Sequence, residues 1–173
     1  MSTLRRYSMR DASEIANRAA SAIERKLWSQ PSTVDVVNVE DDAAYQSKDI
    51  DILWRRKLED GSIKTIKIEV KGDRHYYTGN YFLETISNES KGTPGCFMYT
   101  EADFVYYYFV DEGELHILPM PATRDWFKKH LSQFKERKTS TPVGNGKHYV
   151  TVGRLVPRHV VLANVPGVKI LKL

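Results

Sequence analysis

Two stretches of the chain, residues 48–54 (KDIDILW) and residues 66–73 (IKIEVKGD), place charged residues inside segments with strand-like composition. Between them, residues 59–62 (EDGS) contain Asp-Gly, which is a strong signal for a tight hairpin. Side chains alternate between the two faces of a strand, so Asp51 and Glu69 each lie on the charged face of their strand. A hairpin sets the strands side by side, and we therefore expect the two acidic faces on one side of a sheet.

Two carboxylates held close together form a pocket of hard oxygen ligands, which suits Mg²⁺ or Mn²⁺. Lys71 follows Glu69 by two residues and shares its face, where it could orient an attacking water or stabilise developing charge. Asp49 lies on the same face as Asp51 in an extended strand and competes with it as a ligand. The alternative interpretation is an edge hairpin with one solvated charged face.

The succession of an acid, a hairpin and Glu-x-Lys resembles the PD-(D/E)XK nuclease superfamily, with Asp51, Glu69 and Lys71 as the matching residues. The family core is a helix, a three-stranded meander, a helix and a strand. Residues 9–28 would be that first helix, and the resemblance covers roughly residues 9–110. Ile50 stands where the family name has proline. The resemblance implies an α/β (α+β) fold, a restriction-endonuclease-like core in which helices flank a central mixed β-sheet.

The resemblance also implies an activity, a metal-dependent hydrolysis of DNA phosphodiester bonds, most simply by an endonuclease. Mg²⁺, with Mn²⁺ as a substitute, would be bound by Asp51, Glu69 and the backbone carbonyl of Val70. Asp51 is preferred over Asp49 because two aliphatic residues follow it, as in the family. The alternative function is a non-catalytic DNA-binding or assembly protein on the same scaffold.

Further acids could join this site. Many such nucleases carry a glutamate on the first helix, and the sequence leaves Glu14 and Glu24 equally open. Residues 78–84 (TGNYFLE) look like the segment that borders the active site in small phage and bacterial members. We therefore predict that Glu84 takes part in the site and that Asn80 lines it.

We expect a single domain over residues 1–173, since the chain has 173 residues and shows neither a repeat nor a linker. Apolar periodicity predicts a helix over residues 9–28 and a second helix from an N-cap at Thr123 to about residue 137. The other expected elements are strands at residues 34–39, 50–58, 63–70, 104–110, 114–118, 149–155 and 159–162, with loops at residues 41–48, 74–95 and 138–147.

The charge is uneven along the chain: residues 124–158 hold nine Lys or Arg and two acids, although the whole chain carries only +4. A basic C-terminal third, about residues 120–173, fits a polyanion such as DNA. The predicted DNA contacts are Arg74, His75, Lys128, Lys129, Lys135, Arg137, Lys138 and Lys147. A solvated helix face is the alternative for the lysines.

Cutting both strands of DNA would call for a homodimer with one site per strand. We expect neither a membrane span nor a signal peptide, because no apolar run is long enough and none follows the N-terminal arginines. The single cysteine favours a reducing cytoplasm, and the resemblance implies that this is the cytoplasm of a bacterial or phage-infected cell.

Overall fold

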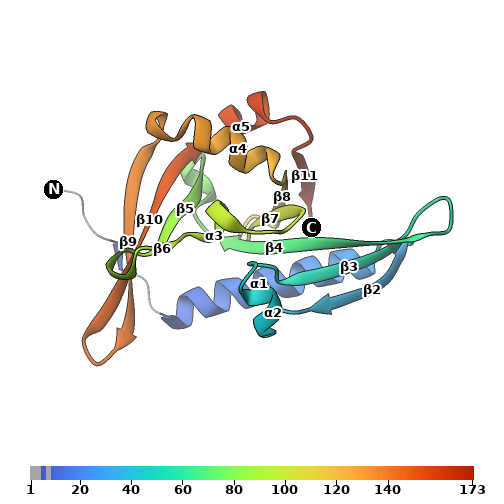
Figure 1. Cartoon of the computed structure of the whole chain (residues 1–173), viewed down its shortest axis with the longest axis horizontal. Helices are drawn as coiled ribbons and strands as arrows, with labels where there is room; N and C mark the ends of the chain where they lie inside the picture. Colours follow the sequence, from blue (N-terminus) through green and yellow to red (C-terminus); the bar gives the residue numbers. More distant parts are fainter. Residues whose placement is uncertain (1–4, 7–8) are drawn as a thin grey trace. The chain divides into compact units, whose positions relative to one another are not determined.

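The computed structural model describes residues 5–6 and 9–173 (Figure 1). The protein is α+β, as predicted, with a mixed β-sheet and helices. The chain forms two compact units, residues 15–75, 100–121 and 167–173, and residues 1–14, 76–99 and 122–166. We call them the six-stranded unit and the five-stranded unit after their sheets. Among the described residues, no helix is both long and apolar enough to cross a membrane.

The six-stranded unit contains most of helix α1 and the sheet that carries the predicted acids. Its sheet has the order β11-β8-β7-β4-β3-β2, in which β4 and β7 are parallel and the other neighbours are antiparallel. The elements are α1 (Met9–Trp28), β2 (Thr33–Asn38), α2 (Ala43–Gln46), β3 (Ile52–Lys57), β4 (Ile63–Asp73), β7 (Phe104–Phe109), β8 (Glu114–Pro119) and β11 (Lys169–Lys172).

The predicted hairpin joins β3 to β4. The Leu58 N–H donates to the Ser62 carbonyl, and Gly61 has a φ of 83°, a left-handed conformation that glycine adopts without strain. The register pairs Ile52 with Ile68 and Lys57 with Ile63. Strand β2 pairs antiparallel with β3, which confirms the predicted three-stranded meander.

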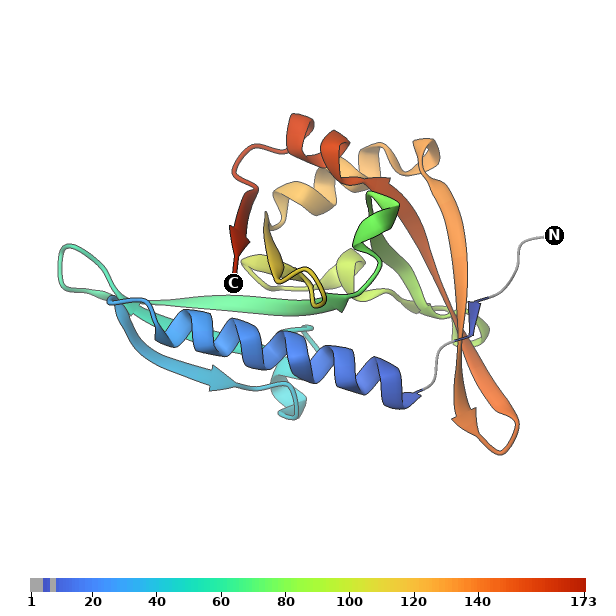
Figure 2. The ribbon, with the colours of Figure 1, turned by 180° about the vertical axis from the view of Figure 1, so that it is seen from behind.

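One face of this sheet packs against α1, which runs along β4 in Figure 2. Helix residues Ala19, Ile23 and Leu27 belong to one buried cluster with Ile52 and Ile68. Since side chains alternate along a strand, the residues directly before and after Ile52 and Ile68 in their strands point to the opposite face. Hydrophobic burial against the helix therefore determines which face receives the charged residues of β4.

The five-stranded unit has its own sheet, in the order β1-β9-β10-β5-β6. Strand β1 runs parallel to β9, and the remaining neighbours are antiparallel. The elements are β1 (Arg5–Arg6), η1 (Tyr76–Thr78), β5 (Asn80–Asn88), η2 (Glu89–Lys91), β6 (Thr93–Pro94), α3 (Cys96–Tyr99), α4 (Ala122–Lys129), η3 (Leu131–Gln133), β9 (Lys135–Gly144), β10 (Lys147–Pro157) and α5 (Arg158–Asn164).

Several predicted elements in this unit were wrong. Residues 74–95 are not mainly loop, because β5 buries Tyr81 and Leu83 on one face. The predicted loop at residues 138–147 is mostly strand β9, whose polar sequence KERKTSTPVG lacks the apolar alternation that marks a strand. Residues 159–162 belong to helix α5 rather than to a strand.

The second predicted helix is shorter than expected. Helix α4 ends at Lys129, and Thr123 lies inside it, fully buried, rather than at its N-cap. The aromatic residues that suggested a longer helix still meet, since the Phe127 and Phe134 rings stack with centroids 6.2 Å apart. The turn η3 brings Phe134 back to the core. The helix-like spacing of the aromatic residues therefore comes from packing of two separate segments and not from one continuous helix.

Gly72 of β4 allows the close approach of α1. A Cβ atom at this position would lie 2.9 Å from the Ile15 carbonyl oxygen and 3.1 Å from the Ala19 Cβ. We expect Gly72→Ala to lower the free energy of unfolding by about 1–3 kcal/mol, because helix and strand must separate. Urea denaturation measures this loss. Thr65→Ala, at an exposed position of the same strand, is the control and should stay within about 0.5 kcal/mol of wild type.

Candidate functional site

Asp51 lies directly before β3, and the pairing of the strands holds it beside Glu69. Its backbone N–H donates to the Ile68 carbonyl at 2.9 Å, and its carbonyl accepts from the Val39 N–H at 2.7 Å. Its carboxylate Oδ2 accepts a further hydrogen bond, 2.7 Å, from the backbone N–H of Val70. Asp51 is therefore anchored to both neighbouring segments, and its side chain is held against β4.

The Glu69 and Asp51 carboxyls lie close enough for each to shift the pKa of the other. Glu69 is only 7% exposed, and its Oε2 atom is buried without a hydrogen bond to any residue that the structure describes. A buried carboxylate oxygen without a partner is costly unless a proton or a cation compensates it. A positive charge placed next to the Glu69 Oε2 atom would therefore compensate for its burial.

Lys71 shares the face of β4 that carries Glu69, because the two residues are separated by one position in the strand. Burial raises the pKa values of both Asp51 and Glu69, and the positive charge of Lys71 opposes this rise. The sequence-predicted trio of Asp51, Glu69 and Lys71 is therefore brought together on the face that points away from α1.

Asp49 lies near the same site, but in a part of the fold that the sequence did not predict. It is not part of β3 but lies in the turn after α2, with a φ of 55°. The Thr100 hydroxyl donates to the Asp49 carbonyl at 2.8 Å, which helps to hold this turn. A carboxylate oxygen of Asp49 lies within 4.8 Å of one of Glu69, so both acids could contribute to one cation site.

The electrostatics follow from burial and from the concentration of acids. The pKa of Glu69 is raised well above its usual value, first by burial and then by the charges of Asp51 and Asp49. Burial also raises the pKa of Asp51, against the opposing effects of the Val70 N–H, Glu69 and Lys71. Without a bound cation, these carboxyls hold protons at a pH at which exposed acids have lost theirs.

Sequence reasoning missed Glu40, which lies between β2 and α2. Its pKa is raised by burial, by Asp51, by Asp41 and by Glu24. The acidic run Glu40-Asp41-Asp42 was visible in the sequence, but Asp41 and Asp42 were interpreted as part of a polar loop and Glu40 was left unassigned. Glu24 accepts a hydrogen bond from the Asn38 side chain at 2.9 Å. These contacts place Glu24 in the same unit as Asp51, whereas Glu14 belongs to the five-stranded unit.

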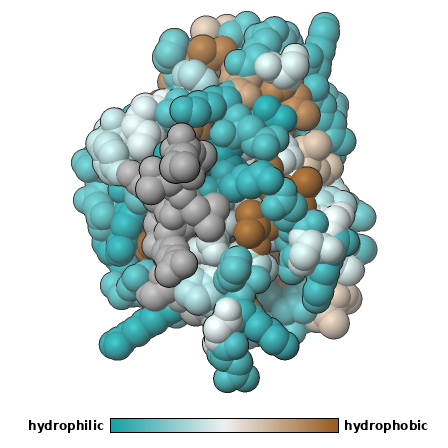
Figure 3. Space-filling view, turned by 90° about the vertical axis from the view of Figure 1, so that its left-hand side faces the viewer, coloured by the Kyte–Doolittle hydropathy of each residue, from teal (hydrophilic) through white to brown (hydrophobic). Residues whose placement is uncertain are grey.

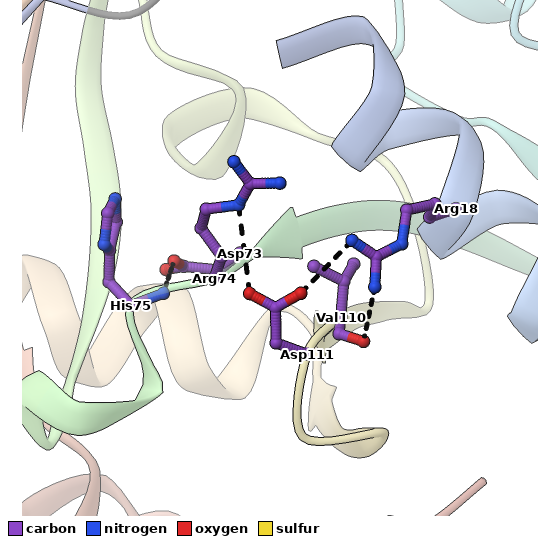
Figure 4. Close-up of polar contacts among 6 residues, drawn as sticks. All are labelled: Arg18, Asp73, Arg74, His75, Val110 and Asp111. Carbon is purple, nitrogen blue, oxygen red and sulfur yellow. Dashed lines mark hydrogen bonds and ion pairs between the residues drawn. The ribbon is translucent and has the colours of Figure 1, made fainter. Parts of the chain in front are cut away.

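The charged row on β4 continues to Asp73, a residue that the sequence analysis did not single out (Figure 4). Asp73 accepts hydrogen bonds from the backbone N–H of His75 at 2.7 Å and from the hydroxyl of Tyr107. Tyr107 is 1% exposed and is the register partner of Lys71 on β7. The alternation Glu-x-Lys-x-Asp in IEVKGD was the available sequence signal for this extension.

An ion-pair network lies at the ends of β4 and β7 (Figure 4). Arg18 donates to the Asp111 carboxylate at 3.2 Å and to the Val110 carbonyl at 3.1 Å. The Arg74 Nε atom lies 3.9 Å from the other Asp111 carboxylate oxygen. Asp111 thus offsets part of the charge of Arg74, one of the predicted DNA contacts.

His75 belongs to the six-stranded unit with Arg74, and the predicted lysine and arginine contacts beyond them belong to the five-stranded unit. Lys128 and Lys129 lie at the end of α4. Lys135 and Arg137 were expected on a helix and Lys138 in the loop after it, but the structure places all three on β9, and Lys147 begins β10. Lys138 forms an ion pair with Glu89. Glu84 and Asn80 lie on β5 of this unit, and their role beside Asp51 and Glu69 stays a prediction.

Comparison of the chain with protein-family models, with curated proteins and with solved structures finds no significant match. The functional argument therefore depends on the residues of the site.

The raised pKa of Glu69 predicts a pH-dependent cost to stability in the absence of metal. Above the usual glutamate value of 4.5, the folded protein binds more protons than the unfolded chain, so its stability falls as the pH rises. Glu69→Gln removes this effect. In EDTA, we expect it to raise the free energy of unfolding by about 1 kcal/mol or more at pH 8, since one pKa unit is worth about 1.4 kcal/mol.

Urea denaturation at pH 8 and at pH 4.5 measures this effect, and the gain should shrink at the lower pH. Glu59→Gln, at an exposed position of the β3–β4 hairpin, is the control and should show no comparable gain. An equal gain at both pH values would mean that packing, rather than charge, explains the difference.

Proposed function

We propose that the protein is a metal-dependent nuclease that hydrolyses DNA phosphodiester bonds and that it belongs to the PD-(D/E)XK nuclease superfamily. The observation that carries the proposal is the buried carboxyl pair of Asp51 and Glu69, with the unsatisfied Oε2 atom of Glu69, on the same sheet face as Lys71. The order of a helix, the meander β2–β3–β4 and a strand β7 parallel to β4 supports a restriction-endonuclease-like core.

The donor set suits a hard divalent cation. Asp51, Glu69 and the Val70 carbonyl would hold Mg²⁺, with Mn²⁺ able to substitute, and Asp49 and Glu40 lie where they could add negative charge. When bound, the ion would polarise the scissile phosphate and lower the pKa of a coordinated water. A cation would also satisfy the buried oxygen of Glu69 and replace the proton that its raised pKa favours.

The chain's own residues supply positioning and charge. Lys71 orients the attacking water and donates a hydrogen bond to the negative charge that develops on the phosphate oxygens. The Asp51 carboxylate is held in one orientation by the Val70 N–H, so its remaining oxygen is available to a ligand. The basic residues of the five-stranded unit hold the phosphate backbone. A homodimer would supply one site to each strand of a duplex.

Metal binding is testable apart from activity. We expect Mn²⁺ to bind the wild-type protein in calorimetry with release of protons, because the ion would displace the proton of Glu69, which the buffer then takes up. Proton release is measured by repeating the titration in buffers of different ionisation enthalpy. Glu69→Gln should weaken Mn²⁺ binding by about tenfold or more, and Glu59→Gln should not. Equal affinity in Glu69→Gln would contradict this site and leave the non-catalytic binding protein as the better interpretation.

Cleavage tests the proposed activity directly. Supercoiled plasmid and labelled single-stranded and branched DNA are incubated with Mg²⁺, Mn²⁺ or EDTA. We expect cleavage only with metal, and a loss of about 10²-fold or more in Asp51→Asn, Glu69→Gln and Lys71→Ala. Lys67→Ala is the matched control, since it removes a lysine from the same face of the same strand, two residues before Glu69. Its rate should stay within about threefold of wild type.

Equal losses in Lys71→Ala and Lys67→Ala would mean that general positive charge, and not Lys71 itself, supports the reaction. Cleavage that persists in EDTA, or that all three site variants retain, would overturn the nuclease proposal at this site. RNA added to the same assay shows whether the activity is confined to DNA.

A further inference from the structure

Strands β9 and β10 extend beyond the rest of their sheet (Figures 1 and 2). Strand β10 pairs with β5 only over residues 152–157, and β9 pairs with β1 only at Thr139 and Ser140. Among the described residues, the segment 141–149 is therefore a two-stranded ribbon whose strands pair only with each other. We call residues 141–149 the β9–β10 arm.

The arm is exposed and free of acidic residues. Residues 142–148 are all exposed, and the turn at Gly144, Asn145 and Gly146 has positive φ throughout. Glu136 is the last acidic residue of the chain. The five-stranded unit as a whole has thirteen Lys or Arg against six Asp or Glu, a net charge of +7. The face on the left of Figure 1, where β9 and β10 lie, is predominantly hydrophilic (Figure 3).

The dimensions of the arm match a groove of double-stranded DNA. At about 3.4 Å per residue, four residues per strand extend about 14 Å, and paired strands are about 4.8 Å apart. The major groove of B-DNA is about 12 Å wide and about 8.5 Å deep, and it admits a two-stranded ribbon. The cross-strand pairs Thr141–Tyr149 and Pro142–His148 place polar groups on both faces of the arm.

We propose that the β9–β10 arm enters a groove of double-stranded DNA, with Lys147 and His148 near the phosphates and Asn145 at the tip near the base edges. This inference rests on the proposed function for its DNA substrate and deepens it by naming a duplex as the form that is bound. Single-strand binding relies on exposed aromatic rings on which bases stack, and the exposed residues 142–148 include no Phe, Tyr or Trp, while Tyr149 is half-buried.

The test compares duplex with single-stranded DNA for a shortened arm. Residues 143–147 are replaced by Asn-Gly, which closes a two-residue hairpin between Pro142 and His148. Binding of a fluorescein-labelled 20-base-pair duplex and of one of its strands is measured by anisotropy in EDTA, where no cleavage is expected. We expect the duplex affinity to fall by about tenfold or more and the single-strand affinity to change by less than about twofold.

A second variant keeps the backbone of the arm intact. Lys147→Gln should make the negative slope of log affinity against log salt concentration shallower by about one, as expected for the loss of one phosphate contact. The matched control is Lys64→Gln, which removes an exposed lysine near the other hairpin, between β3 and β4, and should leave the slope unchanged. If the shortened protein fails to fold, as judged by circular dichroism, the Lys147→Gln comparison decides the question.

The outcomes separate this inference from the proposed function. Unchanged duplex affinity after shortening, an equal loss for single strands, or no DNA binding by the wild type would overturn the role of the arm. Metal-dependent cleavage of the same duplex is read in parallel. If the protein cleaves the duplex but binds it equally well without the arm, only the proposed role of the arm is overturned. If binding depends on the arm but no cleavage occurs, only the proposed nuclease activity is overturned.

Discussion

The pairing of β3 with β4 is the constraint on which the site depends. This register sets Asp51 opposite the Ile68–Glu69 segment and lets the Val70 N–H fix the orientation of its carboxylate. Two carboxyls in contact, one of them buried, repel each other when both are ionised. The backbone hydrogen bonds of the meander hold the two carboxyls together against this repulsion. The pKa of Glu69 is raised by its burial and by this repulsion.

The apolar face of the sheet keeps this arrangement from relaxing. Ile52 and Ile68 are fully buried in the cluster with α1, and Gly72 lets the helix lie close against β4. A shift of β4 by one residue would bury Glu69 and Lys71 under the helix and expose the isoleucines, so the register is strongly specified. Hydrophobic packing on one face therefore determines the electrostatics on the other.

The charges divide between the two compact units. The six-stranded unit carries thirteen Lys or Arg and sixteen Asp or Glu, a net of −3, and includes the carboxylate site. The five-stranded unit carries +7 and includes the β9–β10 arm. A cation site requires a local excess of acids, whereas binding of a polyanion requires a basic surface, and separate sheets allow the chain to carry both. The proposed nuclease would use the basic residues to hold a phosphate backbone and the carboxylate site to act on it.

The sequence by itself determined the meander and the central trio. Strict alternation in IKIEVKGD and the Asp-Gly turn specify which residues share a face, because both are local properties of the backbone. Only the tertiary structure decided the rest. Asp49 and Glu40 approach the site through a turn and a loop, β9 is a strand because it pairs with β10, and the buried Tyr107 contacts Asp73 because β7 lies parallel to β4. These contacts join residues far apart in the chain, and no local pattern of side chains encodes them.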